Sequence, residues 1–239
     1  MPTESNEGKL TLLRERGITP DEYQIQSFAA IDAGSSVLVA APTSSGKTLV
    51  AEYAIDRALE RGETVVYTTP IKALSNQKFK DLSRWLGKDR VGLLTGDNAI
   101  RPEAHVVVMT TEVLRNMIYA DSPSLVNLGL VVLDEVHFLQ DPYRGPVWEE
   151  VIMQLPSAAR LVCLSATVSN AHEVAGWIQE VHGDCEAVIE TTRPVELHDH
   201  FLVFDKRHQR LQEFRTLRYG ESNIEVERYL GQMSGQRYM

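Results

Sequence analysis

The sequence predicts an α/β protein built on a doubly wound parallel sheet. Three observations predict it: short apolar runs rich in β-branched residues recur, segments with helical spacing lie between most of them, and a polar tail follows each run. Runs that are apolar throughout suit strands that helices cover on both faces. Six runs qualify: SVLVAA (36–41), TVVYTT (64–69), RVGLLT (90–95), HVVVMT (105–110), LVVLD (130–134) and RLVCLS (160–165).

Segments between these runs carry apolar residues at helical spacing. Examples are LVAEYAIDRAL (49–59), KALSNQKFKDLSRWL (72–86) and HEVAGWIQEV (172–181). In such a sheet the binding residues gather at the carboxyl ends of the strands. The tails found there are APTSSGKT, TTPIKA, TGD, TTEVL, DEVH and SAT. We therefore expect one continuous polar rim along one edge of the sheet.

Composition and rhythm divide the chain into two parts. The 239 residues are 43% apolar and 24% charged, with a net charge of −9. We assign residues 1–204 to the α/β lobe and 205–239 to a connector or the truncated start of a following region, because the strand-helix rhythm stops there. The last part has a net charge of +2, which leaves −11 on the lobe. An acidic lobe does not attract polyanions nonspecifically, so any contact with nucleic acid has to be local.

Membrane and cysteine signals are weak. No stretch approaches the roughly 18 uninterrupted apolar residues of a membrane span, and the N-terminus MPTESNEGK lacks a basic flank followed by an apolar stretch. Cys163 and Cys185 have neither disulfide-framework nor metal-ligand spacing. We expect a cytoplasmic protein with no membrane partner.

The tail of the first run predicts a phosphate-binding loop. Such a loop points backbone N–H groups at phosphate oxygens, and the next helix adds its positive N-terminal end. Lys47 would reach the β and γ phosphates, and the Thr48 hydroxyl would bind Mg²⁺. Ala41 stands where the pattern has its first glycine, a change that adds only a methyl group. The predicted nucleotide-binding residues are Ala41, Pro42, Thr43, Ser44, Ser45, Gly46, Lys47 and Thr48.

A second element, VVLDEVHFL, ends a buried run in two carboxylates. A carboxylate there is costly unless it is paired or binds a metal, so Asp134 is the candidate Mg²⁺ ligand. Glu135 is the candidate base or orienter of the attacking water, since phosphoryl transfer to water depends on positioning and charge neutralisation. The alternative is that the pair only caps a helix.

APTSSGKT, DEVH and LSAT occur in that order, and with them the chain resembles the first motor lobe of superfamily two helicases of the DExH type. The stretches DEVHFLQDPYRGPVWEEVIMQLP, LLTGD, MTTEVLRNMIY and LSATVSNAHEVAGWI resemble the superkiller-type RNA helicases that work with RNA-degrading exosomes. The resemblance covers roughly residues 10–204. It implies a RecA-like P-loop NTPase lobe that binds ATP and Mg²⁺, with RNA and RNA-degradation machinery as partners.

The resemblance also assigns roles to residues. It implies that Gln24 reads the adenine and that Tyr23 packs near the base, and it makes Lys47, Asp134, Glu135 and His137 the catalytic set, with His137 linking the nucleotide to a second lobe. Ser165 and Thr167 would couple hydrolysis to strand movement. The residues that match the motifs gripping the nucleic-acid backbone are Pro70, Lys72, Ala73, Thr95, Gly96, Thr110, Thr111 and Arg115.

Small and hydroxyl residues at strand ends suit such a grip, because they expose N–H and Oγ donors to phosphate oxygens. Taken singly, TTP, TGD and TTE also fit turn and helix-cap chemistry.

Motors of this kind hold ATP between two RecA-like lobes, and the second lobe supplies arginines. No such arginine segment follows here, so the chain is expected to be a fragment, an engineered first lobe or a truncated product. Two functions of different class remain. One is the amino-terminal lobe of an ATP-dependent RNA helicase; the other is an isolated module that binds nucleotide and nucleic acid without productive turnover. DNA is a third option, since backbone grips do not read the sugar decisively.

Overall fold

The computed structural model describes residues 13, 17–166, 170–195, 198–205, 209–218 and 221–234. It forms two compact units, Met1–Arg193 and Pro194–Met239. All the candidate site residues belong to the first unit, although Thr167 lies outside the described residues.

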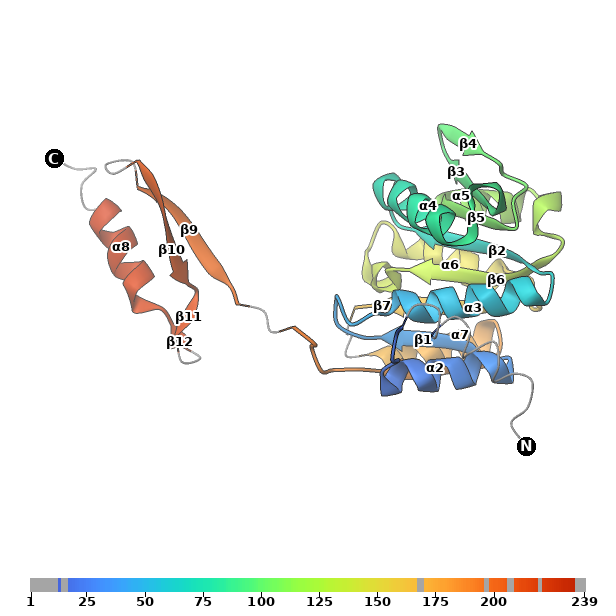
Figure 1. The fold of residues 1–239 in the computed structure, drawn as a ribbon, viewed down its shortest axis with the longest axis horizontal. Coiled ribbons are helices and arrows are strands. Elements are labelled where there is room, and N and C mark those ends of the chain that lie inside the picture. Colours follow the sequence, from blue (N-terminus) through green and yellow to red (C-terminus); the bar gives the residue numbers. More distant parts are fainter. Residues whose placement is uncertain are drawn as a thin grey trace. The chain divides into compact units, whose positions relative to one another are not determined.

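A central sheet organises the first unit, and within the described residues it has eight strands (Figure 1). Their order across the sheet is β4-β3-β5-β2-β6-β7-β1-β8. Neighbouring strands run parallel except β4, which is antiparallel to β3. The strands are β1 Ser36–Ala40, β2 Thr64–Thr69, β3 Val91–Thr95, β4 Asn98–Ile100, β5 Val106–Thr110, β6 Leu128–Asp134, β7 Arg160–Ser165 and β8 Cys185–Ile189.

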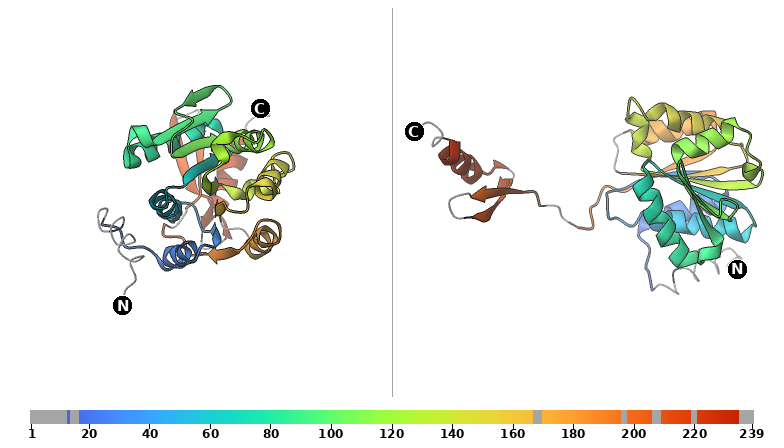
Figure 2. Two further views of the ribbon diagram at one scale, coloured as in Figure 1. Left: turned by 90° about the vertical axis from the view of Figure 1, so that its right-hand side faces the viewer. Right: turned by 90° about the horizontal axis from the view of Figure 1, so that it is seen from above.

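Helices cover both faces of this sheet (Figure 2). On one face lie α2 Glu22–Ala33, α3 Thr48–Glu60 and α4 Lys72–Leu86; on the other lie α5 Thr111–Tyr119, α6 Gly145–Gln154 and α7 Ala171–Val181. Alternate residues of each strand face opposite sides, so Val37 and Val39 pack under α2–α4 while Leu38 packs under α5–α7. Short 3₁₀ turns connect elements: η1 Lys88–Arg90, η2 Pro123–Leu125 and η3 Val136–Gln140. The predicted doubly wound α/β fold is confirmed.

Two strands of the sheet are absent from the sequence prediction. β4 is three residues long with a polar first residue, and β8, of sequence CEAVI, has a charged residue at its second position. Both are edge strands, where one side is unpaired and polar residues are tolerated. Continuous apolar runs are typical of central strands, so a prediction based on such runs does not find β4 and β8.

The second unit contains an antiparallel pair, β9 His200–Asp205 with β10 Arg210–Arg215. A shorter pair follows, β11 Leu217–Arg218 with β12 Glu221–Ser222, and then α8 Ile224–Ser234. The rings of Phe214 and Tyr229 lie 5.0 Å apart and join β10 to α8. Within the described part of the chain, no helix combines the length and apolar character needed to span a membrane.

Candidate functional site

The loop between β1 and α3 has the backbone conformation of a phosphate cradle. Ser44 and Gly46 have positive φ angles of 68° and 89°. The positive φ favours glycine at position 46, and a Cβ there would lie 2.8 Å from Gln24 Nε2, so the Gln24 side chain would have to move. Ala41 is fully buried, and its N–H donates to the Ser165 carbonyl at 3.2 Å. The methyl group that replaces the expected glycine hydrogen is therefore accommodated in the core.

Lys47 folds back over this loop. Its Nζ donates to the carbonyls of Ala41 at 2.6 Å and Pro42 at 2.9 Å. Burial lowers the pKa of Lys47, and the negative charges of Glu135 and Asp134 partly oppose that effect. In the structure, carbonyl oxygens of the loop therefore hold the ammonium group at the position from which it could reach a phosphate oxygen.

The carboxylates follow β6 at the same edge. Asp134 is the last residue of β6, and its Oδ1 accepts the N–H of Glu135 at 3.0 Å. Glu135 has a φ of 59°, a left-handed conformation that is uncommon outside glycine and often marks functional sites. His137 Nδ1 lies 3.3 Å from Glu135 Oε2, and its ring stacks on Phe138.

Two further side chains hold Asp134. The hydroxyl of Tyr67, a fully buried residue of β2, donates to Asp134 Oδ2 at 2.8 Å. Lys78 of α4 places Nζ 4.0 Å from the same oxygen and 5.0 Å from the centre of the Tyr67 ring. Burial and the Asp134 charge raise the pKa of Tyr67 well above its ordinary value, so this hydroxyl remains a donor.

The loop and the carboxylates share one pocket of about 440 Å³. The loop contributes Thr43, Ser44, Gly46, Lys47 and Thr48, and β6 contributes Asp134 and Glu135. The remaining wall is formed by Thr69, Leu74, Gln77, Lys78 and Leu164. An ammonium group, a hydroxyl and two carboxylates thus converge on one cavity, as an ion-bound polyphosphate requires.

Gln24 and Tyr23 contact the loop from α2. Gln24 Nε2 donates to the Gly46 carbonyl at 3.0 Å, and its Oε1 accepts the Asp21 N–H at 2.9 Å. Tyr23 donates its hydroxyl to the Ser45 carbonyl at 2.6 Å. Both side chains thereby brace the phosphate loop, and adenine recognition by Gln24 stays a prediction. Ala41, Pro42 and Ser45 lie outside the pocket lining.

The predicted nucleic-acid residues follow β2, β3 and β5, which are neighbours in the sheet. Their carboxyl ends therefore lie along one edge. Lys72 forms an ion pair with Asp97, and Thr95 Oγ1 donates to Asp97 Oδ1 at 3.1 Å. The bond with Lys72 has the largest effect on the pKa of the Asp97 carboxyl and lowers it. The bond with Thr95 lowers this pKa further. Asp97 thus ties the start of α4 to the loop after β3.

The other members of this set differ in accessibility. Pro70 is buried, Ala73 and Gly96 are exposed, and Thr110 is half-buried. Thr111 is 1% exposed, which leaves its Oγ1 inside the lobe. Arg115 lies with Nη1 3.6 Å from Glu150 Oε2. Contacts of these residues with nucleic acid stay predictions.

Ser165 closes β7 beside the loop. Its carbonyl accepts the Ala41 N–H, and its buried Oγ has no hydrogen-bond partner within the described residues. The end of β7 and the start of the phosphate loop therefore share a hydrogen bond, a direct link between the two predicted motifs. Thr167, the second predicted coupling residue, lies outside the described residues.

Tyr67 and Lys78 are site residues that sequence reasoning missed. Lys78 lies in the expected helical segment 72–86, and its side chain is only 16% exposed. A signal was present, because Lys78 is four residues from the buried Leu82 and thus shares its side of the helix. The sequence pattern places Tyr67 only within the apolar run 64–69.

The fold and this pocket define a P-loop nucleotide-binding lobe of the RecA-like class. Residues 21–174 match the family described as DEAD/DEAH box helicase, which is more than half of the chain. The chain therefore belongs to the DEAD/DEAH box helicase family, whose members bind ATP.

Individual relatives agree with this assignment. The chain is 58% identical over 183 residues to the "Probable helicase HelY" of Mycobacterium tuberculosis, covering 77% of this chain and 20% of that protein. It is 50% identical over 184 residues to human "Superkiller complex protein 2", and the match covers 77% of this chain and 14% of that protein. The crystal structure of the "DUF1998 helicase MrfA bound to DNA and AMPPNP" shares the fold, with a TM-score of 0.66 and 24% identity over 80% of this chain and 30% of that one. The chain spans a fifth or less of the two curated relatives.

Proposed function

We propose that this chain is the ATP-binding lobe of an RNA helicase of the DExH type, with DEVH as its signature, which acts with RNA-degradation machinery. The observation that carries the proposal is the single pocket lined by Lys47, Thr48, Asp134 and Glu135. The name of the human relative and the stretch from DEVH to MQLP support the superkiller-type assignment.

The donor set fits Mg²⁺ and ATP. Mg²⁺ prefers hard oxygen ligands and few protein groups, which the Thr48 hydroxyl and the Asp134 carboxylate would supply. Bound Mg²⁺ would neutralise phosphate charge. Lys47 and the loop N–H groups would hold the triphosphate, and Tyr67 would keep Asp134 oriented. Glu135 would orient a water, and its left-handed backbone sets the direction in which its side chain leaves the main chain.

Turnover requires a second RecA-like lobe in this proposal, because arginines of that lobe stabilise the charge of the transition state, an effect of about 10³–10⁵ in rate. His137 lies beside Glu135 and would link the nucleotide to that lobe. The alternative is a lone module that binds ATP and nucleic acid without productive turnover. DNA is the alternative substrate, since hydroxyl and backbone donors along the rim do not read the sugar.

The decisive experiment measures ATP hydrolysis with single-stranded RNA or DNA, on this chain and on one extended by a second lobe. We expect stimulation by RNA in the longer chain only. Equal stimulation by DNA would contradict the assignment of RNA as the specific substrate. Full activity of the short chain would show that hydrolysis does not require a second lobe.

Two variants test the site itself. Lys47→Ala should abolish binding of a fluorescent ATP analogue or weaken it strongly, and unchanged affinity would remove the phosphate-loop assignment. Glu135→Gln, in the two-lobe chain, should bind ATP but stop its hydrolysis. A normal turnover number would place the water-orienting residue elsewhere.

A further inference from the structure

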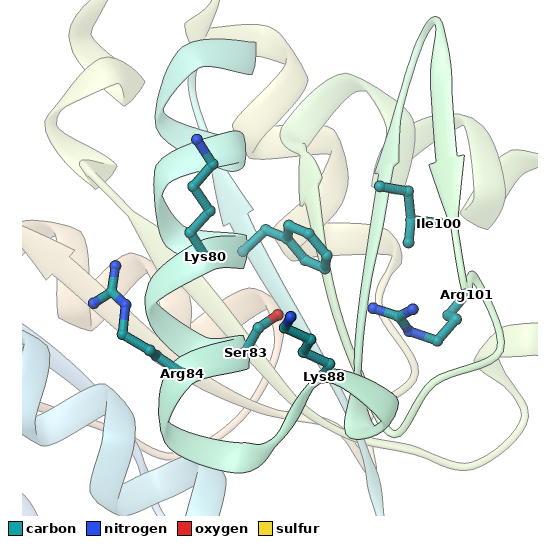
Figure 3. Close-up of a pocket in the computed structure, with 7 residues that line it drawn as sticks. Lys80, Ser83, Arg84, Lys88, Ile100 and Arg101 are labelled. Atoms are coloured by element: carbon teal, nitrogen blue, oxygen red, sulfur yellow. The ribbon is translucent and has the colours of Figure 1, made fainter.

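A second pocket, of about 500 Å³, lies between α4 and the strand pair β3–β4 (Figure 3). None of its lining residues also lines the nucleotide pocket. Its volume suits one large side chain with its flanking backbone. The roles already assigned to the first unit do not account for this cavity.

The floor of this pocket is apolar and fixed in place. Phe79 and Ile100 line it, and both are partly buried and packed against the core under α2–α4. The Phe79 ring thus presents a supported apolar surface rather than a freely exposed face. A pocket with this floor favours an inserted apolar side chain.

Cations surround the floor. Lys80, Lys88 and Arg101 line the pocket, and in Figure 3 Arg101 extends from the strand side toward α4, while the nitrogen of Lys88 lies near Ser83. Arg101 is anchored by its Nε, which donates to the Val91 carbonyl at 3.1 Å. Among the described residues, Lys80 and Lys88 form no ion pair, and the lining contains no carboxylate. On a chain of net charge −9, this is a local concentration of positive charge.

Two other residues of the lining are Arg84 and Ser83. Arg84 also lines the pocket, but it forms an ion pair with Asp81 at 3.1 Å and is thereby partly neutralised. Ser83 Oγ is buried and has no hydrogen-bond partner within the described residues.

The pocket lies at the amino edge of the sheet. Lys88 belongs to η1, which directly precedes β3, and Arg101 binds the carbonyl of Val91, the first residue of β3. The nucleotide pocket and the predicted nucleic-acid rim lie at the carboxyl ends of the strands. A strand gripped along that rim therefore does not run through this pocket.

We infer that this pocket binds a short acidic segment of a partner protein. One large apolar side chain of that segment enters between Phe79 and Ile100, and its carboxylates meet Lys80, Lys88 and Arg101. Charge complementarity selects the acidic segment. Nucleic acid fits less well, because bases stack on open aromatic faces and the Phe79 ring is packed against the core.

The test uses a fluorescent peptide of about nine residues, alternating Asp and Glu around one central Phe, with fluorescence anisotropy as the readout. Lys88→Glu should weaken binding at least about tenfold, since it reverses a charge at the pocket. Arg90→Glu is the matched control: Arg90 is exposed in the same 3₁₀ turn but does not line the pocket, so affinity should change less than about threefold. A peptide with Ala in place of Phe should bind at least about tenfold more weakly.

Each contrary outcome overturns the inference. Equal losses with Lys88→Glu and Arg90→Glu would indicate only general attraction to a basic surface. Equal binding of the Ala peptide would remove the apolar anchor. Lack of binding by the Phe peptide would reject the acidic segment, and preferential binding of an oligouridylate of equal charge, lost in Lys88→Glu, would make the pocket a nucleic-acid site. Thermal melting of both variants verifies that they are folded.

Discussion

At the residue scale, we predict that Lys47 links protonation to nucleotide binding. Burial lowers its pKa in the free lobe, whereas a bound polyphosphate favours its charged form. Binding should therefore take up protons at alkaline pH, and affinity for ATP should fall as pH rises through the lowered pKa. Calorimetry in buffers of different ionisation enthalpy measures this uptake.

Lys47→Arg is the control for that prediction. Its guanidinium stays charged across the accessible range, so the alkaline loss of affinity should disappear even if overall affinity drops. The pKa values of Tyr23 and Tyr67 are raised by burial, so these phenols do not replace Lys47 as the titrating group. An identical pH profile in Lys47→Arg would assign the effect to another group.

Tyr67 allows a second prediction at this scale. Tyr67→Phe keeps the buried ring but removes the hydrogen bond to Asp134. Loss of a group that orients a metal ligand typically costs about 10–100-fold in metal affinity or activity. We expect the Mg²⁺ concentration for half-maximal nucleotide binding to rise about tenfold or more, while binding in EDTA is unchanged.

Tyr53→Phe is the matched control for Tyr67→Phe. Tyr53 is equally buried, and its hydroxyl donates to Asp32 at 2.7 Å, but neither residue lines the nucleotide pocket. This variant should change stability by about 1 kcal/mol and leave the Mg²⁺ titration in place. Equal shifts in both variants would mean that Tyr67 acts through stability alone.

At the element scale, the sheet edge depends on a close backbone approach at Gly92. A Cβ there would lie 2.1 Å from the Arg101 carbonyl oxygen, and a backbone atom cannot swing aside. Gly92→Ala should therefore destabilise the lobe by about 1–3 kcal/mol, as overpacking does, and displace the segment after β4. Thermal melting measures the first effect, and binding of the acidic peptide measures the second.

Gly176→Ala is the comparison for Gly92→Ala. Gly176 lies in α7, and no atom comes within 4 Å of a Cβ built there. Because alanine is the better helix former, this change should be neutral or stabilise by up to about 1 kcal/mol. A Gly92→Ala protein that melts like the parent chain would show that β4 tolerates displacement.

The elements that could be predicted are those whose pattern is local. The six apolar runs correspond to β1, β2, β3, β5, β6 and β7. Each of these strands is buried on both faces, so its own sequence is apolar throughout and identifies it without information on the neighbouring strands. β4 and β8 depend on a partner strand for their pairing, which no local run reveals. The sequence analysis also lacks the hairpin β9–β10. Its strands pair with each other, and their residues are largely exposed, so they form no continuous apolar run.

At the scale of the whole molecule, the convergence of the site depends on strand order. The rule that binding residues follow parallel strands correctly predicted that Lys47 and Asp134 would face one pocket. Tyr67 could not be predicted, because its contact with Asp134 requires that β2 lie beside β6, and residues 67 and 134 are far apart in sequence. The pocket under α4 likewise requires the return of β4 along β3.

The charge of the whole molecule gives the last prediction, which concerns salt. Of the eight predicted nucleic-acid residues, only Lys72 and Arg115 are cationic, and they lie beside Asp97 and Glu150. With about 0.7 counterions released per neutralised phosphate of a single strand, log affinity against log salt should have a slope no steeper than about −1.4. Lys72→Gln should flatten the slope by about 0.7 or less. Anisotropy of an oligouridylate at several KCl concentrations measures both, and a slope steeper than about −3 would mean that cations outside this rim hold the strand.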